Sequence, residues 1–578
     1  MLAKLLYLLL LPVRTLFYFW RLVSFRIRKG DHFFLDVPSS FSYDKKSFFI
    51  KFFLAKEENP FFVDFLIGLR TLSRVKGLRK ISLHFELPEY GYGEVWNLCQ
   101  SILSLKKKGI KVAGYSLGGG VKSLLLLSHC DERYSSSASE FFPVLPSAEP
   151  YFFGGTAKKF GVNVEAYASG AFKAFGETFQ RTSFSPPAKK NLESLLSDQK
   201  QFLEESFRAT SGLKLSLLEE PILTAEQLYQ NKFLTDLIEE DSFRDNYTFK
   251  DYNSPNPDLK VKPDYKSLSV KALILHSKLE QFKLLPKFSP IVVVLPIQGN
   301  ILPDLGREED FRSRQVSYRY YKNILKDLKE DPKVSAVVLE MNSPGGSALV
   351  SELLYREIKK VSEVKPVYTY VLNVAASGGY YLACGSHEIH SSPYSIVGSI
   401  GAVMLRLDMK GLYEKVGVKK ERIGFYPYRE ILSEYGKLGK NSEQFLKKEV
   451  LRSRDQFYQR VIESRKTSHK ELESKWGEGR VFIGKTFQKA GFIDSCSSLL
   501  EILDKAKAKI GAKNIRIKYW PGTYSWKDLI HDLRPGLAQK TILSRFSFLE
   551  EAVKTFANSR GNLYYSDLAV SILEKEIN

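Results

Sequence analysis

Two glycine-rich segments decide the fold of this chain. They are Asn342-Ser343-Pro344-Gly345-Gly346-Ser347 and, with its serine 31 residues after Gly346, Ala375-Ala376-Ser377-Gly378-Gly379-Tyr380-Tyr381. The first is typical of a strand that ends in a turn, and the second of a strand that gives way to a helix at a serine. A serine hydroxyl beside bare backbone N–H groups suits acyl-transfer chemistry. The pattern therefore predicts a nucleophile at Ser377, and the base that takes its proton has to be found elsewhere.

The residues around these segments alternate between strand-like and helix-like patterns. Residues 331–346 predict a buried strand that ends in a glycine turn, residues 347–363 an amphipathic helix, and residues 367–374 a second strand. Strands that alternate with helices indicate parallel βαβ units. We therefore expect an α/β fold built from βαβ repeats.

The same order recurs more faintly in the first half of the chain. Strand-like residues 78–85 and 110–115 flank a helical pattern, and Gly118-Gly119-Gly120 then opens an apolar run. Downstream, Lys158-Lys159-Phe160-Gly161-Val162 matches Glu414-Lys415-Val416-Gly417-Val418, and the offset between the halves stays near 256–259 residues. A constant offset over so long a stretch predicts two homologous α/β domains. The two domains are expected at 30–275 and 286–511. An N-terminal segment at 1–29 and a C-terminal helical tail at 512–578 flank them.

Bulk composition restricts the function only loosely. The 578 residues carry a net charge of +21, which is compatible with nucleic acid or with anionic lipid. Because the basic residues are scattered and no nucleic-acid motif is present, we expect no nucleic-acid partner. The four cysteines lie far apart without a CxxC pair, and His387 and His390 have no third ligand beside them, so neither a metal nor a cofactor is expected.

The N-terminal segment points to a membrane. Residues 1–29 contain no acidic residue, yet the unbroken apolar run from Leu5 to Val13 is too short to span a bilayer. Arg14, Arg21 and Arg28 recur every seven residues and so fall on one helical face. This pattern predicts an amphipathic helix in the membrane interface, with a tilted span and snorkelling arginines as the alternative.

The second half resembles peptidase family S49, the signal peptide peptidases, which share the ClpP/crotonase fold. The resemblance rests on Val337 to Gly346, Asn373 to Tyr381 and Val397-Gly398-Ser399-Ile400-Gly401. It extends more weakly, in register, over about 32–240, as in the long tandem-domain branch of that family. It does not cover the last 65 or so residues.

The resemblance implies a Ser–Lys dyad. In the tandem branch the serine comes from the second half and the lysine from the first, in a Gly-x-aromatic-Lys pattern that matches Gly170-Ala171-Phe172-Lys173. The repeat supports Lys173, because the counterpart position in the second half is Arg429, which cannot act as a base. In the first half, Gly118 or a neighbour takes the place of the serine. One departure is Ala174, where the family often has a serine, so that its hydrogen bond must come from elsewhere, with Ser399 a candidate.

An oxyanion hole is expected next to the nucleophile. A tetrahedral intermediate needs two N–H donors. Gly378 directly follows the serine at a helix start and can supply one, helped by the helix dipole. The second is expected from Gly345 or Gly346, where glycine lets the backbone approach the substrate closely.

Three other functions compete with this interpretation. Gly114-Tyr115-Ser116-Leu117-Gly118 fits the G-x-S-x-G elbow of an α/β-hydrolase, for which His129 or His276 could complete a triad. A catalytically inactive membrane scaffold of the same fold is a second possibility. A crotonase-type acyl-CoA enzyme is a third, although a lysine facing Ser377 disfavours it.

By resemblance, the expected function is that of a membrane-associated serine endopeptidase. Its substrates would be apolar peptides such as cleaved signal peptides, and its partners would be membrane lipid and further copies of itself, assembled as a tetramer. The expected location is the cytoplasmic membrane of a bacterium, with the catalytic domains on the periplasmic or outer side. Arg26, Arg28 and Lys29 after the apolar stretch oppose export of the downstream chain, so the residues alone leave the orientation open.

Overall fold

The computed structural model describes residues 31–43, 59–210, 213–245, 265–281, 290–303, 315–423 and 429–520. The membrane helix predicted for 1–29 and the tail beyond residue 520 lie outside these residues. Among the described helices, none combines the length and the apolar character that crossing a bilayer requires.

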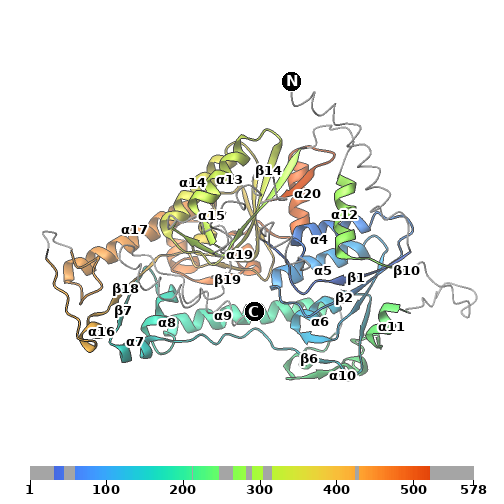
Figure 1. Ribbon diagram of the computed structural model, residues 1–578, viewed down its shortest axis with the longest axis horizontal. Helices are drawn as coiled ribbons and strands as arrows, with labels where there is room; N and C mark the ends of the chain where they lie inside the picture. The colour runs from blue at the N-terminus through green and yellow to red at the C-terminus, as the bar shows by residue number, and fades with distance from the viewer. Residues whose placement is uncertain are drawn as a thin grey trace, which may run out of the picture.

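The first half folds around a six-stranded parallel sheet (Figure 1). Each neighbouring pair runs in the same direction, as βαβ connections require. In order across the sheet, the strands are β10 (Tyr265–Ser267), β1 (His32–Val37), β2 (Lys80–Phe85), β3 (Lys111–Tyr115), β5 (Glu132–Ser135) and β9 (Asp236–Leu237).

The second half repeats this order in its own sheet. Its strands β21 (Arg516–Tyr519), β11 (Ile291–Gln298), β14 (Val334–Ser343), β15 (Val367–Ala376), β16 (Glu388–Ser391) and β20 (Ser495–Cys496) are paired in parallel. The far end of β15 also pairs with β17 (Ile396–Gly398), which pairs antiparallel with β19 (Val481–Ile483). The first half has the matching small sheet of β4 (Gly118–Gly120), β6 (Glu140–Phe142) and β8 (Leu223–Thr224).

The α/β class and the repeated strand order predicted from the sequence are therefore confirmed. The predicted strand, helix, strand order around the nucleophile is present as β14, α14 (Ala348–Ser362) and β15, followed by α15 (Gly378–Ala383). Its first-half counterpart is β2, α5 (Tyr92–Lys106), β3 and α6 (Val121–Ser128). The domain bounds remain predictions.

The two halves share one hydrophobic core. Successive residues of a strand point to opposite faces of its sheet. Val292 and Val294 of β11 accordingly join the core that also contains Leu35 and Leu83 of the first sheet, whereas Val293 packs in a second core on the other face. Because side chains of both sheets meet in the shared core, the halves are fixed against each other rather than loosely tethered.

Helices fill the space between and around the sheets. Those that contribute to the shared core are α4 (Phe62–Leu72), α5, α6, α9 (Pro186–Thr210), α10 (Ala225–Gln230), α12 (Val270–Gln281) and α20 (Leu499–Lys509). The second core holds residues of α13 (Tyr318–Glu330), α14, α15, α17 (Lys440–Ser464) and α19 (Gly484–Lys489). Two further short helices are α11 (Glu240–Asp245) and α18 (His469–Glu471).

An arm from each half meets at one end of the molecule, on the left of Figure 1. The first-half arm carries α7 (Gly154–Phe160), β7 (Asn163–Ala168) and α8 (Glu177–Gln180), and the second-half arm carries β18 (Val403–Asp408) and α16 (Lys410–Lys415). β7 and β18 form an antiparallel pair from Val403 opposite Ala168 to Asp408 opposite Asn163. This pairing brings the first half close to the turn that holds Ser377.

Candidate active site

Ser377 lies in a sharp turn between β15 and α15. Its φ of 51° is positive, a conformation that non-glycine residues seldom adopt, and its N–H donates to the Gly398 carbonyl at 2.9 Å. The two glycines behind it are required by space. A Cβ at Gly378 would collide with Ser351 Oγ, and one at Gly379 would lie 2.5 Å from the Ser343 carbonyl oxygen.

Lys173 reaches this turn from the first half. It follows β7 and is 7% exposed, and its Nζ lies 2.9 Å from Ser377 Oγ although 204 residues separate the two in sequence. The structure therefore brings together the two residues that the sequence singled out as nucleophile and base.

Ser399 provides the other polar contacts of the lysine. Lys173 Nζ donates to the Ser399 carbonyl at 2.7 Å and to Ser399 Oγ at 2.9 Å. A neutral amine has two N–H donors and one lone pair. With both donors directed to Ser399, the lone pair is left for the Ser377 hydroxyl. Ser399 thus supplies the hydrogen bond that Ala174 cannot.

Burial sets the protonation of Lys173. Loss of solvent around the ammonium lowers the pKa of Lys173 from 10.5 to about 7. Desolvation disfavours the charged form of an amine, so that a substantial fraction is neutral near physiological pH. The arrangement can therefore accept a proton from a hydroxyl.

A turn of the second half, residues 477–480, contacts the loop at residues 170–173 that carries Lys173 (the lysine loop). The Phe172 N–H donates to the Glu478 carbonyl at 3.1 Å, and the Arg480 guanidinium lies 4.0 Å from the centre of the Phe172 ring. Farther along the arm, the Ser169 N–H donates to the Ala402 carbonyl at 2.9 Å. The lysine is thus positioned by backbone contacts with the half that carries the serine.

The Pro-Gly-Gly turn lies beside Ser377. A Cβ added at Gly345 would lie 2.6 Å from the Gly378 nitrogen, so any side chain there would cover that N–H. Gly345 N–H donates to Ser343 Oγ at 3.2 Å, and Gly346 follows with a φ of 144°. The glycine turn and the start of α15 therefore adjoin, as an oxyanion hole requires.

Strand pairing shows what the first half has in place of the serine. Gly118 pairs with Glu140 as Val374 pairs with Ile396, and both differences (374 − 118 and 396 − 140) are 256. At this offset the counterpart of Ser377 is Val121, rather than the Gly118 region expected from the sequence. The counterparts of Gly345 and Gly346 are Glu89 and Tyr90, so the first half has neither a nucleophile nor a glycine turn at this position.

Ser116, the serine of the alternative G-x-S-x-G motif, makes a hydrogen bond within its own turn. Ser116 is 1% exposed and its hydroxyl donates to the Gly118 carbonyl at 2.8 Å. The His129 ring contacts the Leu125 carbonyl and Ser128 Oγ. Ser116 and His129 thus direct these contacts to the backbone and to Ser128 rather than to each other.

The two histidines weighed as metal ligands have structural contacts. His387 accepts a hydrogen bond from the Val367 N–H, and His390 Nδ1 lies 2.8 Å from Ser495 Oγ. Within the described residues, no group of three or more histidine, cysteine, aspartate or glutamate side chains is arranged to hold a metal ion.

Comparison with known proteins supports one family. Residues 359–513 match peptidase family S49, and the curated relatives that match most of the chain are named SppA or Protease 4. Chloroplastic serine protease SPPA of Arabidopsis thaliana is 27% identical over 444 residues, which is 74% of this chain and 63% of the plant protein. Protease 4 of Haemophilus influenzae is 24% identical over 442 residues, covering 72% of this chain and 67% of the relative.

The chain spans less than two thirds of the length of this plant relative. Among solved structures it is similar to the 1510-N membrane protease specific for a stomatin homolog from Pyrococcus horikoshii. That similarity covers 42% of this chain and 96% of the other, with 18% identity and a TM-score of 0.22.

Sequence reasoning missed the turn that holds the lysine. Glu478, Gly479 and Arg480 belong to no motif, and they matter because of close approach in space. One signal was available in the sequence, because Arg480 opens the stretch that repeats Pro221 to Thr224 of the first half.

Proposed function

We propose that this chain is a serine endopeptidase in which Ser377 is the nucleophile and Lys173 the general base. The observation that carries the proposal is the 2.9 Å separation between Lys173 Nζ and Ser377 Oγ, with the lysine buried at the junction of the halves. Ser–Lys pairs are established variants of the triad. The match of residues 359–513 to a peptidase family supports the reaction class.

The proposed reaction runs in two steps. As Ser377 Oγ bonds to the peptide carbonyl carbon, its proton passes to Lys173 Nζ. Lys173 then gives that proton to the departing amine nitrogen while the C–N bond breaks, which leaves an acyl-enzyme. In the second step a water loses a proton to Lys173 and attacks the ester, and Ser377 regains its proton as the acid product leaves.

Gly378 and Gly346 are the proposed oxyanion donors. Gly378 N–H lies at the start of α15, where the helix dipole favours negative charge. Of the two glycines in the turn, Gly345 has its N–H directed to Ser343 Oγ, which favours Gly346 as the second donor. Loss of one such donor costs roughly 100-fold or more in kcat in well-studied proteases.

The substrates are proposed to be apolar peptides, such as cleaved signal peptides, bound in an extended conformation. A relative from Enterococcus faecium carries the name putative signal peptide peptidase SppA, which supports this class. By resemblance to the same family we also propose that the chain lies at a bacterial cytoplasmic membrane, in contact with lipid, with its catalytic domains on the periplasmic or outer side.

Separate replacement of the two candidate serines tests the proposal. We expect Ser377→Ala to abolish hydrolysis of an apolar peptide and labelling by a fluorophosphonate probe, while Ser116→Ala leaves both intact. Loss of activity only in Ser116→Ala would favour the hydrolase alternative. Failure of the probe to label Ser377 in the folded protein would favour an inactive scaffold.

A further inference from the structure

One end of the second sheet is an edge strand close to the candidate site. β19 comes last in the strand order of this sheet, and its Val481 lies opposite Gly398 of β17. A strand at an edge presents backbone N–H and C=O groups that no further strand pairs with. β17 lies between this edge and β15, the strand that leads into Ser377. A contact at the edge can therefore influence the strands that hold the serine turn.

A side chain of the first half covers this edge. Asn191 Nδ2 donates to the Val481 carbonyl at 3.1 Å, and the Val481 N–H donates to Asn191 Oδ1 at 3.0 Å. A side-chain amide carries both a donor and an acceptor. Asn191 thus bonds to both backbone groups of Val481, as a residue of a further strand would. The two residues lie 290 positions apart in the sequence, and their contact joins the two halves.

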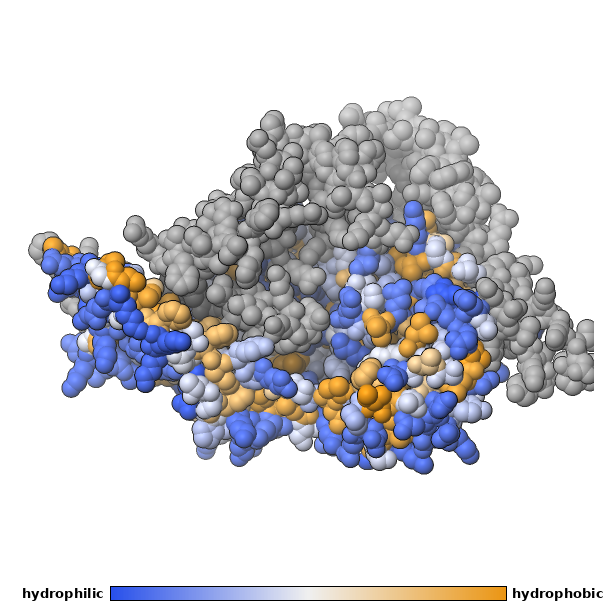
Figure 2. Space-filling model, turned by 60° about the horizontal axis from the view of Figure 1, so that its bottom comes forward, coloured by the Kyte–Doolittle hydropathy of each residue, from blue (hydrophilic) through white to orange (hydrophobic). Residues whose placement is uncertain are grey.

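Asn191 lies on the inner side of α9. Ala188, three positions before it, and Leu195, four positions after it, are both buried, and this spacing places the three residues on one side of a helix. α9 runs along the bottom of Figure 1, the face that Figure 2 turns forward, where blue hydrophilic residues lie between orange patches. Asn191 is a polar residue on the opposite, inward side, where it bonds to the backbone of Val481.

The strand opposite Val481 holds the Ser377 turn. The Gly398 carbonyl accepts the Ser377 N–H at 2.9 Å. Ser377 has a φ of 51°, a conformation that a non-glycine residue keeps only where its surroundings hold it. A shift of β19 away from β17 would therefore reach the turn that directs the Ser377 hydroxyl.

The residue before Val481 holds the partner of the lysine. The Arg480 carbonyl accepts the Ser399 N–H at 2.6 Å. Ser399 in turn accepts hydrogen bonds from Lys173 Nζ at its carbonyl and at its hydroxyl. The contacts of both Ser377 and Lys173 thus begin within one residue of the position that Asn191 fixes.

We infer that Asn191 is a positioning residue for the proposed Ser–Lys dyad. Its amide fixes the Val481 backbone from outside the sheet and so keeps β19 against β17. Gly398 and Ser399 are thereby held where Ser377 and Lys173 bond to them. Asn191 acts only through these backbone contacts, and the inference rests on the function proposed above for Ser377 and Lys173.

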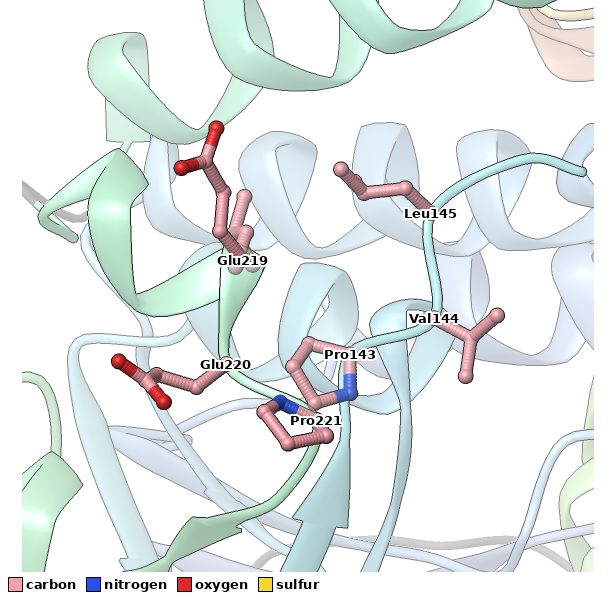
Figure 3. A pocket seen from close by; sticks show the side chains of 7 residues that line it. Pro143, Val144, Leu145, Glu219, Glu220 and Pro221 are labelled. Atoms are coloured by element: carbon pink, nitrogen blue, oxygen red, sulfur yellow. The ribbon is translucent and has the colours of Figure 1, made fainter.

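The equivalent edge of the first half is exposed. β8 pairs with β6 as β19 pairs with β17, and this alignment makes Ile222 the counterpart of Val481. Ile222 is 45% exposed. The turn before it, residues 218–221, borders an open cavity of about 310 Å³, which residues 143–145 line from the other side (Figure 3). The covered edge therefore belongs to the half in which a serine turn has to be held.

A second contact of α9 provides a matched control. Thr486 Oγ1 donates to Asp198 Oδ2 at 2.7 Å, which joins α9 to α19 of the second half. This bond, like that of Asn191, ties α9 to the second half. Thr486, however, lies in a helix that follows β19, and not in the strand itself. Loss of the Asp198 contact would weaken the docking of α9 without releasing the Val481 edge.

Alanine substitutions at the two positions test the inference in the full chain. We expect Asn191→Ala to lower kcat for an apolar peptide about tenfold or more with KM little changed, because misplaced reacting groups slow the chemical step. Burial holds the pKa of Lys173 at about 7, and water that enters a loosened turn would favour the ammonium. The acid limb of the pH profile should therefore move above pH 7. Asp198→Ala should keep the wild-type kcat and pH midpoint.

Hydrogen exchange measured by mass spectrometry gives a readout that does not depend on activity. In Asn191→Ala, peptides that contain the amides of Val481 and Ser399 should exchange faster than in wild type, because local opening of β19 exposes these N–H groups. Asp198→Ala should leave the exchange of both peptides unchanged. Unchanged exchange at Ser399 in Asn191→Ala would refute the positioning role.

Ser377→Ala separates a failure of this inference from a failure of the proposed function. If hydrolysis by the wild-type chain did not depend on Ser377, the proposed function would be wrong, and with it the dyad that Asn191 is inferred to position. If hydrolysis depends on Ser377 but Asn191→Ala has the same kcat and pH midpoint as Asp198→Ala, the inference alone is wrong.

Discussion

Gly479 lies directly against the main chain of Lys173. A Cβ atom added at Gly479 would come within 2.5 Å of both Cα and N of Lys173, closer than real Cβ contacts allow. Gly479 also has a φ of +87°, and its N–H donates to the Ile400 carbonyl at 2.8 Å. The glycine thus joins the lysine loop of the first half to the serine-bearing half without any side-chain contact.

Replacement of Gly479 by alanine should therefore impair activity more than folding. The added methyl group would push the Lys173 main chain away and lengthen the Nζ–Oγ distance, and a misplacement near 1 Å can cost about 100-fold in rate. Gly491→Ala is the matched control, because Gly491 has a φ of +83° but no neighbour within 4 Å of its added Cβ. Peptide hydrolysis and thermal unfolding of both variants check this. Equal activity in the two variants would show that Gly479 does not position the lysine.

The pH dependence of hydrolysis should report the buried lysine. Lys173 must be neutral to accept a proton, and burial lowers its pKa to about 7. We therefore expect kcat/KM to fall about tenfold per pH unit below pH 7 and to level off above it. An acid limb near pH 4–5 would indicate a carboxylate base and contradict the role of Lys173.

Lys173→Met should abolish activity and yet stabilise the fold. In the unfolded chain the lysine titrates near 10.5, and in the native state near 7. Between these values the unfolded state binds more protons, so wild-type stability rises with pH across this window. The cost of the buried charge is present in full below pH 7.

Methionine lacks that charge but has a similar volume. Below pH 7 the free energy of unfolding of the variant should therefore exceed that of wild type by up to a few kcal/mol. This difference should shrink toward pH 10. Urea unfolding at pH 6 and pH 9 measures it. A gain that is the same at both pH values would mean that the lysine pKa is not depressed.

Much of the candidate site could be predicted because the two halves repeat detectably in the sequence. Ser377 follows from its glycines, and Lys173 follows from the match between Gly161 and Gly417 together with the family pattern. The exact counterpart of the serine could not be predicted. Strand pairing fixes Val121, whereas the offset of 256–259 residues read from the sequence pointed to Gly118 or a neighbour.

What the sequence could not show depends on close approach between distant segments. Gly479 is one glycine among 38, and the only nearby signal in the sequence is the repeated stretch that begins at Arg480. Glu340 similarly lies in the apolar stretch that ends at Gly346. The alternation of side chains between the two faces of a strand indicates only that Glu340 points toward a buried face of the sheet. The groups around it, Tyr519 of β21 and Glu94 of the first half, lie far from it in the sequence.

Glu340 gives a last prediction about the interface between the halves. It is fully buried on β14, and Tyr519 donates to its Oε2 at 2.9 Å, while its Oε1 has no hydrogen-bond partner among the described residues. Burial, with a smaller contribution from Glu94 of the first half, raises the pKa of Glu340 from 4.5 to about 8.

A raised carboxyl pKa destabilises the fold as pH rises. Between pH 4.5 and 8 the native state binds more protons than the unfolded state, so stability falls with pH, and the cost is present in full above pH 8. Glu340→Gln keeps the size and the acceptor for Tyr519 but cannot ionise. Relative to wild type, the free energy of unfolding of this variant should be higher by a few kcal/mol at pH 8.5 and little changed at pH 4.5.

Chemical unfolding at the two pH values measures this difference. The control is Glu330→Gln on the exposed face of α13, which should show no such dependence. If the stability gain of Glu340→Gln over wild type were the same at both pH values, the Glu340 carboxyl would have to be ionised and solvated in the native protein. The two halves would then not enclose it as the shared core requires.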